Sequence, residues 1–255
     1  MIELAGARVV VTGAGGGVGA ALLTMFGALG ARVVACDVPG ADLDHSAIAE
    51  RHLFDLRDRA ATRAAAAAIV QGGVPQVVVS NAGWTRQDTL DATTPDGIDD
   101  ELARNFTGAA HFTHALLAAM RSDTGTNRAD RAFVFVASVN ALGHHGNPAY
   151  SAAKAALLAW SRAIAVEEGR HGIRSNVVVP ASIRTNAWEY RLAADPTVME
   201  KLTAIYPLGR IVTTDEVARA VAFLASPAAS GITGTTLNVD AGLMAGNLPF
   251  LDAIR

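Results

Sequence analysis

The 255-residue chain is poor in several kinds of residue, and each scarcity excludes a class of protein. It has one cysteine, Cys36, so no disulfide can form within the chain, which fits a reducing compartment. The formal net charge is −3, whereas a protein that binds mainly nucleic acid needs a basic surface. No apolar run reaches the roughly 18 residues of a membrane span, and the first residues lack the pattern of a signal peptide. We therefore expect a cytoplasmic protein that binds neither nucleic acid nor membrane.

What the chain does contain is enough apolar material for a large core. Hydrophobic residues make up 51% of the chain and charged residues 18%, which excludes a disordered chain. His111 and His114 lie three apart, as metal ligands on a helix can, but no further ligand is placed to join them. No metal site is therefore predicted, and packing or a subunit surface is favoured for these two histidines.

Short apolar runs alternate with helical patterns along the whole chain. Strands are predicted at residues 7–11, 31–35, 53–56, 76–79, 132–137, 173–179 and 235–239. Helices are predicted at residues 17–29, 59–70, 98–120, 149–168 and 217–224. Strands that are apolar on both faces belong in a sheet covered on both sides, and their alternation with helices implies parallel strands. The sequence thus predicts one α/β domain over residues 1–255, with a doubly wound parallel sheet flanked by helices on both faces and a candidate substrate lid at 183–207.

A glycine-rich turn at residues 12–19 follows the first predicted strand and opens the first helix. Glycines let the backbone turn sharply and approach a pyrophosphate, whose charge the N–H groups and dipole of the helix stabilise. A flexible loop is the alternative, but a strand–turn–helix context is the one that a dinucleotide site requires. The turn therefore predicts a Rossmann fold that binds a dinucleotide. Its predicted cofactor contacts are Gly13, Gly15, Gly16, Gly17, Val18 and Gly19.

Asp37 ends the second predicted strand, near the position at which an acidic residue meets the adenosine ribose. Its carboxylate can accept hydrogen bonds from both ribose hydroxyls, and it repels a 2′-phosphate. Gly16, Val38 and Pro39 supply no cation that would bind such a phosphate. We therefore expect NAD rather than NADP as the cofactor, with a solvated carboxylate at a strand end as the alternative.

Tyr150 and Lys154 lie four apart at the start of a predicted helix and so share one face, and Ser138 ends the preceding strand. A phenol titrates near pH 10 in water, and a nearby ammonium favours its ionised form. Lys154, together with a bound nicotinamide cation, is therefore expected to lower the pKa of Tyr150 by about three units. Tyr150 would then transfer the proton, and the Ser138 hydroxyl would hold the reacting oxygen. The pair alone is common on helices, and its meaning comes from its place downstream of the glycine turn.

With these residues the chain resembles the short-chain dehydrogenase/reductase family in its common form of about 250 residues. The resemblance covers nearly the whole chain. It rests on the TGxxxGxG turn at 12–19, the stretch Asn81-Ala82-Gly83, Asn105, the Ser138, Tyr150 and Lys154 set, and residues 180–185 and 234–242. Three residues depart from the family's usual pattern, namely Ser80, Ala181 and Ala241.

The resemblance implies roles for residues beyond the glycine turn. Asn105 would join Ser138, Tyr150 and Lys154 in the catalytic set by holding a water in a proton relay to Lys154. Cofactor contacts are implied for Asp55, Leu56, Asn81, Ala82, Gly83, Tyr150, Lys154, Pro180, Ile183 and Thr185. Substrate contacts are implied for Trp84, Asn140, His144, His145 and Trp188, with a solvated loop as the alternative for the two histidines. The helix at 109–120 and the Tyr150 helix resemble the family's subunit contacts, so a homotetramer is expected.

These features predict an oxidoreductase that transfers a hydride between NAD(H) and a secondary alcohol or its ketone. One alternative is an NADPH-dependent 3-oxoacyl-thioester (acyl carrier protein) reductase, because Thr85-Arg86 and residues 207–210 resemble that branch. Asp37 argues against the usual cofactor of that branch. The alternative from another class is a non-catalytic dinucleotide sensor, which would not need the full catalytic set.

Overall fold

Seven parallel strands form a single sheet at the centre of the molecule. The computed structural model describes residues 2–85, 89–123, 131–184, 193 and 195–255. Its strands are β1 (Arg8–Thr12), β2 (Arg32–Asp37), β3 (Ile48–Leu53), β4 (Val77–Ser80), β5 (Arg131–Val136), β6 (Ile173–Pro180) and β7 (Thr236–Val239), in the sheet order β3-β2-β1-β4-β5-β6-β7. The strand order reverses between β1 and β4, where a doubly wound sheet opens its ligand crevice. The predicted α/β fold is confirmed.

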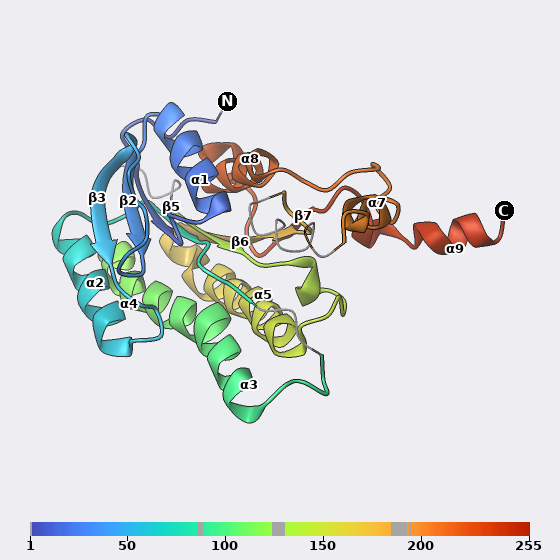
Figure 1. The fold of residues 1–255 in the computed structure, drawn as a ribbon. Helices are drawn as coiled ribbons and strands as arrows, with labels where there is room; N and C mark the ends of the chain where they lie inside the picture. The colour runs from blue at the N-terminus through green and yellow to red at the C-terminus, as the bar shows by residue number, and fades with distance from the viewer. Residues whose placement is uncertain (1, 86–88, 124–130, 185–192, 194) are drawn as a thin grey trace.

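Helices cover both faces of this sheet (Figure 1). On one face lie α1 (Gly17–Ala28) and α8 (Thr214–Ala225), which pack against each other. The other face carries α2 (Arg59–Gln71), α4 (Gly108–Ser122) and α5 (Pro148–Glu168). Successive side chains of a strand point to opposite faces, so Val9 and Val11 join the core under α1 and α8 while Val10 joins the core under α2 and α4. This double burial is why the strands read as near-continuous valine runs.

The third strand is the one whose predicted position is wrong. It was expected at residues 53–56, but β3 occupies Ile48–Leu53. β3 is the edge strand next to β2, and its side chains alternate between half-buried and exposed. Glu50 within it pairs with Arg8 of β1 at 2.7 Å. The strand therefore carries charged residues. The apolar residues Phe54 and Leu56 follow it, and their pattern places the predicted strand too late in the chain.

The helix predicted at residues 98–120 is interrupted by a π-helical turn. Its parts are α3 (Pro95–Leu102), the π turn (Ala103–Thr107) and α4. A π turn inserts an extra residue into a helix and is frequent at functional sites. Asn105 lies within this turn and has no exposed surface.

Among the described residues, two short helices were not predicted, α7 (Val198–Thr203) and α9 (Leu248–Ala253). α9 extends away from the body of the molecule (Figure 1). None of the described helices is long and apolar enough to cross a membrane.

Candidate active site

A cavity of about 950 Å³ opens at the carboxyl ends of the strands. Parallel strands bring these ends to one edge of the sheet, so residues far apart in the sequence meet there. The cavity wall includes residues from the glycine turn, from the ends of β2, β4, β5 and β6, and from the start of α5. The predicted site residues that line it are Gly13, Gly15, Gly16, Gly17, Val18, Gly19, Asp37, Asp55, Leu56, Asn81, Ala82, Gly83, Trp84, Ser138, Tyr150, Lys154, Pro180 and Ile183.

The glycine turn is held in shape by bonds between the ends of β1 and β4. The Thr12 hydroxyl accepts hydrogen bonds from the backbone N–H groups of Asn81 and Ala82, both at 3.1 Å. The Asn81 side chain donates in return to the carbonyls of Thr12, at 3.1 Å, and Gly13, at 3.0 Å. Thr12 belongs to the TGxxxGxG motif. The role of its hydroxyl as a link to the β4 end could not be predicted, because the sequence does not tell which strand lies next to β1.

Two glycines of the turn stand where no larger residue fits. Gly13 has a φ of +66°, and a Cβ there would lie 2.7 Å from Cα of Ala82. A Cβ on Gly19 would lie 2.1 Å from the carbonyl oxygen of Gly13. The helix α1 that follows begins after Gly16 without a capping side chain and without an acidic residue in its first turn. Its first N–H groups and the positive end of its dipole therefore suit a bound pyrophosphate.

Asp37 lies at the opposite wall of the cavity from α5, at the end of β2. Its carboxylate accepts hydrogen bonds from the backbone N–H of Gly15 at 2.8 Å and from that of Val38 at 2.7 Å. These bonds fix the carboxylate against the glycine turn. Asp42 lines the same part of the cavity and adds a second negative charge.

Asp55, predicted to contact the cofactor, pairs with an arginine that the sequence did not single out. Arg57 pairs with Asp55 at 2.6 Å and with Asp100 of α3 at 2.9 Å, and all three side chains are part-exposed. The hydrogen bonds from Arg57 lower the pKa of the Asp55 carboxyl. Arg104, paired with the same Asp100, stacks over the Trp84 ring with its guanidinium 5.1 Å from the ring centroid.

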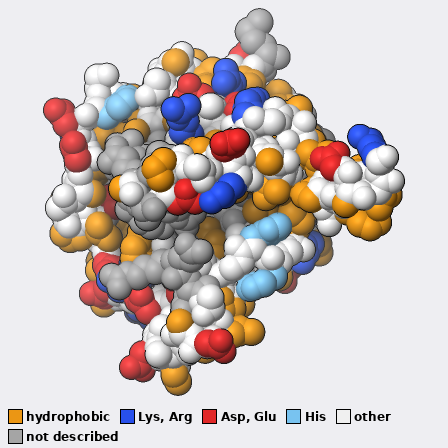
Figure 2. Space-filling view, turned by 45° about the vertical axis from the view of Figure 1, so that its right-hand side comes forward, with side chains coloured by type: hydrophobic (Ala, Val, Ile, Leu, Met, Phe, Trp, Pro, Cys, Tyr) orange, Lys and Arg blue, Asp and Glu red, His pale blue; other side chains and the backbone are white. Residues whose placement is uncertain are grey.

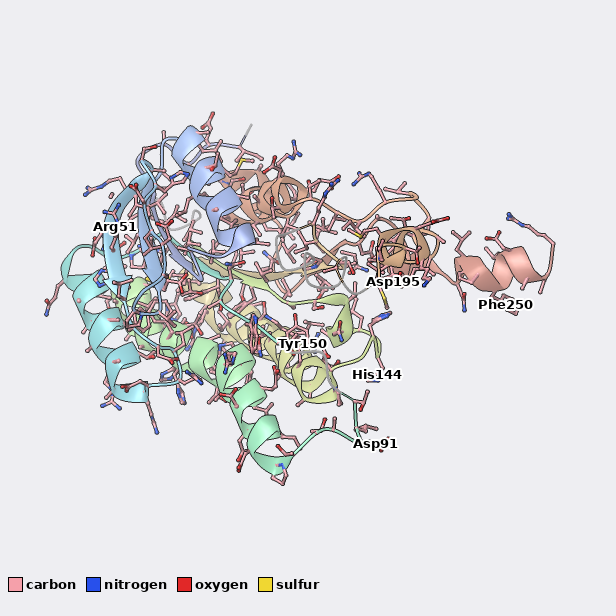
Figure 3. The ribbon with its side chains drawn as sticks, in the orientation of Figure 1. Arg51, Asp91, His144, Tyr150, Asp195 and Phe250 are labelled. Carbon is pink, nitrogen blue, oxygen red and sulfur yellow. The ribbon has the colours of Figure 1, made fainter. Side chains whose placement is uncertain are left out.

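Tyr150, Ser138 and Lys154 converge at one side of the cavity. Tyr150 is hydrogen-bonded to the Ser138 hydroxyl. Lys154 is 3% exposed, and its Nζ donates to the carbonyl of Val136 at 3.1 Å and lies 5.6 Å from the centroid of the Tyr150 ring. Tyr150 lies at the start of α5 and is half-buried (Figure 3). A hydroxyl, a phenol and an ammonium thus surround one end of the cavity.

The expected lowering of the Tyr150 pKa is not found in the protein alone. Burial raises the pKa of Tyr150 to about 12, against the lowering effect of the Ser138 hydrogen bond. Burial also lowers the pKa of Lys154 to about 8. Removal from water penalises the Tyr150 phenolate and the Lys154 ammonium alike. Residue spacing alone does not reveal this effect, because it does not show how deeply the two groups are buried.

Asn105 holds the backbone that carries Trp84. Its Oδ1 accepts from the Trp84 N–H at 3.0 Å, and its Nδ2 donates to the Trp84 carbonyl at 3.0 Å. The same Nδ2 lies 2.7 Å from the Glu101 carboxylate. Asn105 does not line the cavity itself. Glu101 gave no signal in the sequence, because its helix position is informative only once the π turn is known.

Comparison with known proteins identifies the family. The family model described as "Enoyl-(Acyl carrier protein) reductase" matches residues 5–244. The chain is 37% identical to an uncharacterized oxidoreductase of Schizosaccharomyces pombe over 244 residues, which are 95% of this chain and 92% of that protein. The chain belongs to the short-chain dehydrogenase/reductase family.

Two curated relatives carry names that specify an acyl-CoA substrate. This short-chain dehydrogenase/reductase is 32% identical to the (3R)-3-hydroxyacyl-CoA dehydrogenase of Rattus norvegicus, over 95% of this chain and 98% of that protein. It is also 32% identical to the acetoacetyl-CoA reductase of Rhizobium meliloti, over 91% and 96% of the two chains.

Solved structures agree on the fold. An oxidoreductase of the same family from Burkholderia thailandensis superposes with a TM-score of 0.88 at 39% identity, over 98% of this chain and 97% of that one. An NADPH-bound short-chain oxidoreductase from Pseudomonas aeruginosa, described as having an atypical catalytic centre, superposes with a TM-score of 0.85 at 30% identity, over 96% and 99% of the two chains.

The remaining predicted cofactor and substrate contacts of this short-chain dehydrogenase/reductase do not line the cavity or lie outside the described residues. Asn140 turns toward the loop before α5, where its Nδ2 donates to the Gly146 carbonyl at 2.8 Å and to the Ser151 hydroxyl at 3.0 Å. His144 (Figure 3) and His145 are both exposed on that loop, and Nε2 of His145 lies 3.3 Å from the sulfur of Met244. None of these three lines the cavity. Thr185 and Trp188 lie outside the described residues, as does much of the predicted lid at 183–207.

Proposed function

We propose that the protein is an NAD-dependent oxidoreductase that transfers a hydride reversibly between its cofactor and a secondary alcohol or the corresponding ketone. The observation that carries the proposal is that Ser138, Tyr150 and Lys154 line the same cavity as the glycine turn. A dinucleotide whose pyrophosphate rests on the turn would then extend its reactive end toward Tyr150.

Each of the three side chains has a task in this reaction. Bound NAD supplies the hydride acceptor. In oxidation, the Tyr150 phenolate takes the proton of the substrate hydroxyl, and the Ser138 hydroxyl donates a hydrogen bond to the same substrate oxygen. In reduction, Tyr150 returns the proton to the ketone oxygen. Lys154 favours the phenolate through its positive charge. Because burial raises the pKa of Tyr150 to about 12, we expect its ionisation to follow, not precede, binding of a positively charged cofactor.

NAD is proposed over NADP because of the charges at the ribose end of the cavity. The carboxylates of Asp37 and Asp42 both line that end. A 2′-phosphate there would be repelled by both. Dissociation constants for NADH and NADPH test this directly. NADH is expected to bind more tightly, and tighter binding of NADPH would contradict the assignment.

For the substrate, 3-hydroxyacyl thioesters and their 3-oxo forms are the first class to test. Two relatives at 32% identity carry names for opposite directions of this chemistry, a dehydrogenase and a reductase. They support the thioester reductase as the second candidate function. The two candidates differ in cofactor, since the reductase alternative uses NADPH and the carboxylate of Asp37 opposes it.

The decisive experiment is a substrate screen followed by a single substitution. Secondary alcohols and 3-hydroxyacyl thioesters are supplied with NAD, and ketones and 3-oxoacyl thioesters with NADH, while absorbance reports the cofactor. With an active substrate in hand, Tyr150→Phe is expected to reduce kcat at least 100-fold, the scale of a lost general acid or base. Tyr206→Phe is the matched control, because Tyr206 is buried away from the cavity and accepts a hydrogen bond from the Ser182 N–H. Near-wild-type turnover by Tyr150→Phe would contradict the mechanism.

The same screen separates the enzyme from the dinucleotide sensor. A sensor would bind NADH tightly yet turn over none of these substrates. Turnover that depends on Tyr150 excludes it.

A further inference from the structure

Glu101 of α3 lies behind the wall of the candidate active site and is hydrogen-bonded to two segments that border it. Its Oε2 accepts a hydrogen bond from Nδ2 of Asn105 at 2.7 Å, and its Oε1 accepts one from the Thr85 hydroxyl at 2.8 Å. The first partner is fully buried in the π turn, and the second lies in the segment that follows β4. The carboxylate therefore joins two segments that border the site.

Only one amide group separates this carboxylate from Lys154. Oδ1 of Asn105 and Nζ of Lys154 both lie within 3 Å of a single point, the position that a Cβ on Gly83 would occupy. The Asn105 amide thus has Glu101 on its nitrogen side and the region of the ammonium on its oxygen side. Gly83 leaves the space between Asn105 and Lys154 open.

Lys154 needs a counter-charge in this position. A buried ammonium is costly unless a negative charge or hydrogen bonds compensate for lost water. Nζ of Lys154 donates a hydrogen bond to the neutral carbonyl of Val136. Glu101 is the carboxylate whose charge raises the pKa of Lys154 against the dominant lowering by burial. The same charge raises the pKa of Tyr150.

We propose that Glu101 is a positioning residue of this active site, which fixes the Asn105 amide and supplies the negative charge that keeps Lys154 protonated. The kinetic part of this inference rests on the proposed dehydrogenase activity. Among the described residues, Glu101 is hydrogen-bonded to Asn105 and Thr85, so it acts on Lys154 and Tyr150 through Asn105 and through its charge.

Among the described residues, the arginines near Glu101 pair with a different carboxylate. Arg104 of the π turn and Arg57 both pair with Asp100, and Asp99 is exposed on the same helix. α3 packs against α5, and the titratable groups of α5 that face Glu101 are Tyr150 and Lys154. Among the described residues, Tyr150 and Lys154 are therefore the titratable groups of α5 on which the Glu101 charge acts.

Glu101→Gln removes the charge and keeps the shape. The glutamine carbonyl can accept from Asn105, and its NH₂ can donate to the Thr85 hydroxyl. Loss of the negative charge makes the phenolate of Tyr150 easier to form and the ammonium of Lys154 easier to lose, so the pKa of each group falls. At saturating NAD, the positive charge of the cofactor is expected to bring the pKa of Tyr150 below that of Lys154. In the oxidation direction, the acid limb of the kcat/KM profile then follows Tyr150 and the alkaline limb follows Lys154. Both limbs are therefore expected to move to lower pH.

The matched control is Asp99→Asn, which removes an equal charge from the same helix at an exposed position. Its profile is expected to coincide with that of the wild type. A Glu101→Gln profile that has lower amplitude but unchanged limbs would overturn the charge role, since a purely structural residue lowers activity without moving the limbs. A shift of equal size in both variants would also overturn it.

A second measurement does not depend on turnover. The chain has three tyrosines, so labelling their Cζ atoms with ¹³C gives a spectrum in which Tyr150→Phe identifies the Tyr150 resonance. In Glu101→Gln, this resonance is expected to begin its titration at lower pH than in the wild type or Asp99→Asn. An unchanged titration would overturn the inference. If the screen finds no substrate while the resonance shifts, the proposed function has failed and the role of Glu101 stands.

Discussion

At the scale of single residues, Lys154 combines a catalytic position with a cost to folding. It is 3% exposed, and burial lowers its pKa from 10.5 to about 8. At neutral pH the folded protein must therefore hold a charge that water would hold better. An active site that places an ammonium in this way sacrifices stability for function.

We predict that Lys154→Met abolishes turnover and stabilises the fold at pH 7, by up to about 3 kcal/mol. The unfolded chain keeps its lysine proton up to pH 10.5, whereas the folded chain releases it near pH 8. Wild-type stability therefore rises between these pH values through this group, and the advantage of Lys154→Met shrinks. Urea unfolding at pH 7 and pH 9.5 measures both effects, and an advantage that grew with pH would contradict the assignment.

Ala241 is a second residue that lowers the stability of the fold, in this case through backbone strain. It has a φ of +51°, in the left-handed region that penalises a Cβ. Ala241→Gly is expected to stabilise the protein by up to about 1 kcal/mol, because relief of this strain exceeds the added freedom of the unfolded chain. Ala181 is the matched control, since the same replacement there relieves no positive φ and is expected to cost about 0.5–1 kcal/mol. Thermal melts of the two variants should move in opposite directions.

At the scale of elements, the start of α1 depends on a close contact between the backbones of Gly19 and Gly13. A Cβ on Gly19 would lie 2.1 Å from the Gly13 carbonyl oxygen, whereas one on Gly16 would lie 3.4 Å from the same atom. Gly16 has a φ of −77°, which any residue adopts. Gly19→Ala is therefore expected to destabilise the protein by about 1–3 kcal/mol, and Gly16→Ala by less than about 0.5 kcal/mol. Equal melting temperatures for the two variants would contradict this reading of the turn.

Elements with strong local patterns were predictable from sequence, and those defined by their neighbours were not. The valine runs of β1, β2 and β4 and the helix carrying Tyr150 lie within a few residues of their predicted positions. The edge strand β3 was misplaced because its charged residues match Arg8, a partner that only the fold supplies. The π turn was missed for a similar reason, since its extra residue leaves the apolar pattern of the helix nearly intact.

The residues of the candidate site also fall into a predictable and an unpredictable group. Residues carried by a motif, such as the glycine turn and the Ser138, Tyr150 and Lys154 set, were found because their chemistry is visible in their spacing. Arg57 and Glu101 were missed because an exposed arginine and a helical glutamate are common in any sequence. Their roles come from what the fold places opposite them, Asp55 in one case and Asn105 in the other.

At the scale of the whole molecule, exposed apolar side chains on α5 and α9 are candidates for subunit contacts. Val166 on α5 is 82% exposed, and Phe250 on the projecting helix α9 is 58% exposed. Figure 2 shows hydrophobic side chains gathered on the projecting C-terminal segment at the right. We propose a homotetramer assembled through α4 and α5, in line with the expectation from sequence.

This assembly predicts different effects for two substitutions of the same kind. Val166→Asp is expected to shift the protein toward smaller species, because it places a charge in the proposed contact. Phe250→Asp is expected to leave the assembly unchanged. Light scattering coupled to size-exclusion chromatography measures both masses. The opposite result would move the contact to α9, and a monomeric wild type would exclude the tetramer.

The π turn between α3 and α4 has a consequence for how this chain tolerates changes of length. Each residue of a helix advances the direction of its side chains by about 100°. Removal of one residue from Ala103–Thr107 would restore an uninterrupted α-helix and keep its hydrogen bonds, yet rotate α3 by about that angle relative to α4. The face of α3 that carries Glu101 would then turn relative to α4 and to the elements packed on it, while the core under α4 stayed intact. In this stretch a deletion therefore threatens the chemistry before it threatens the fold.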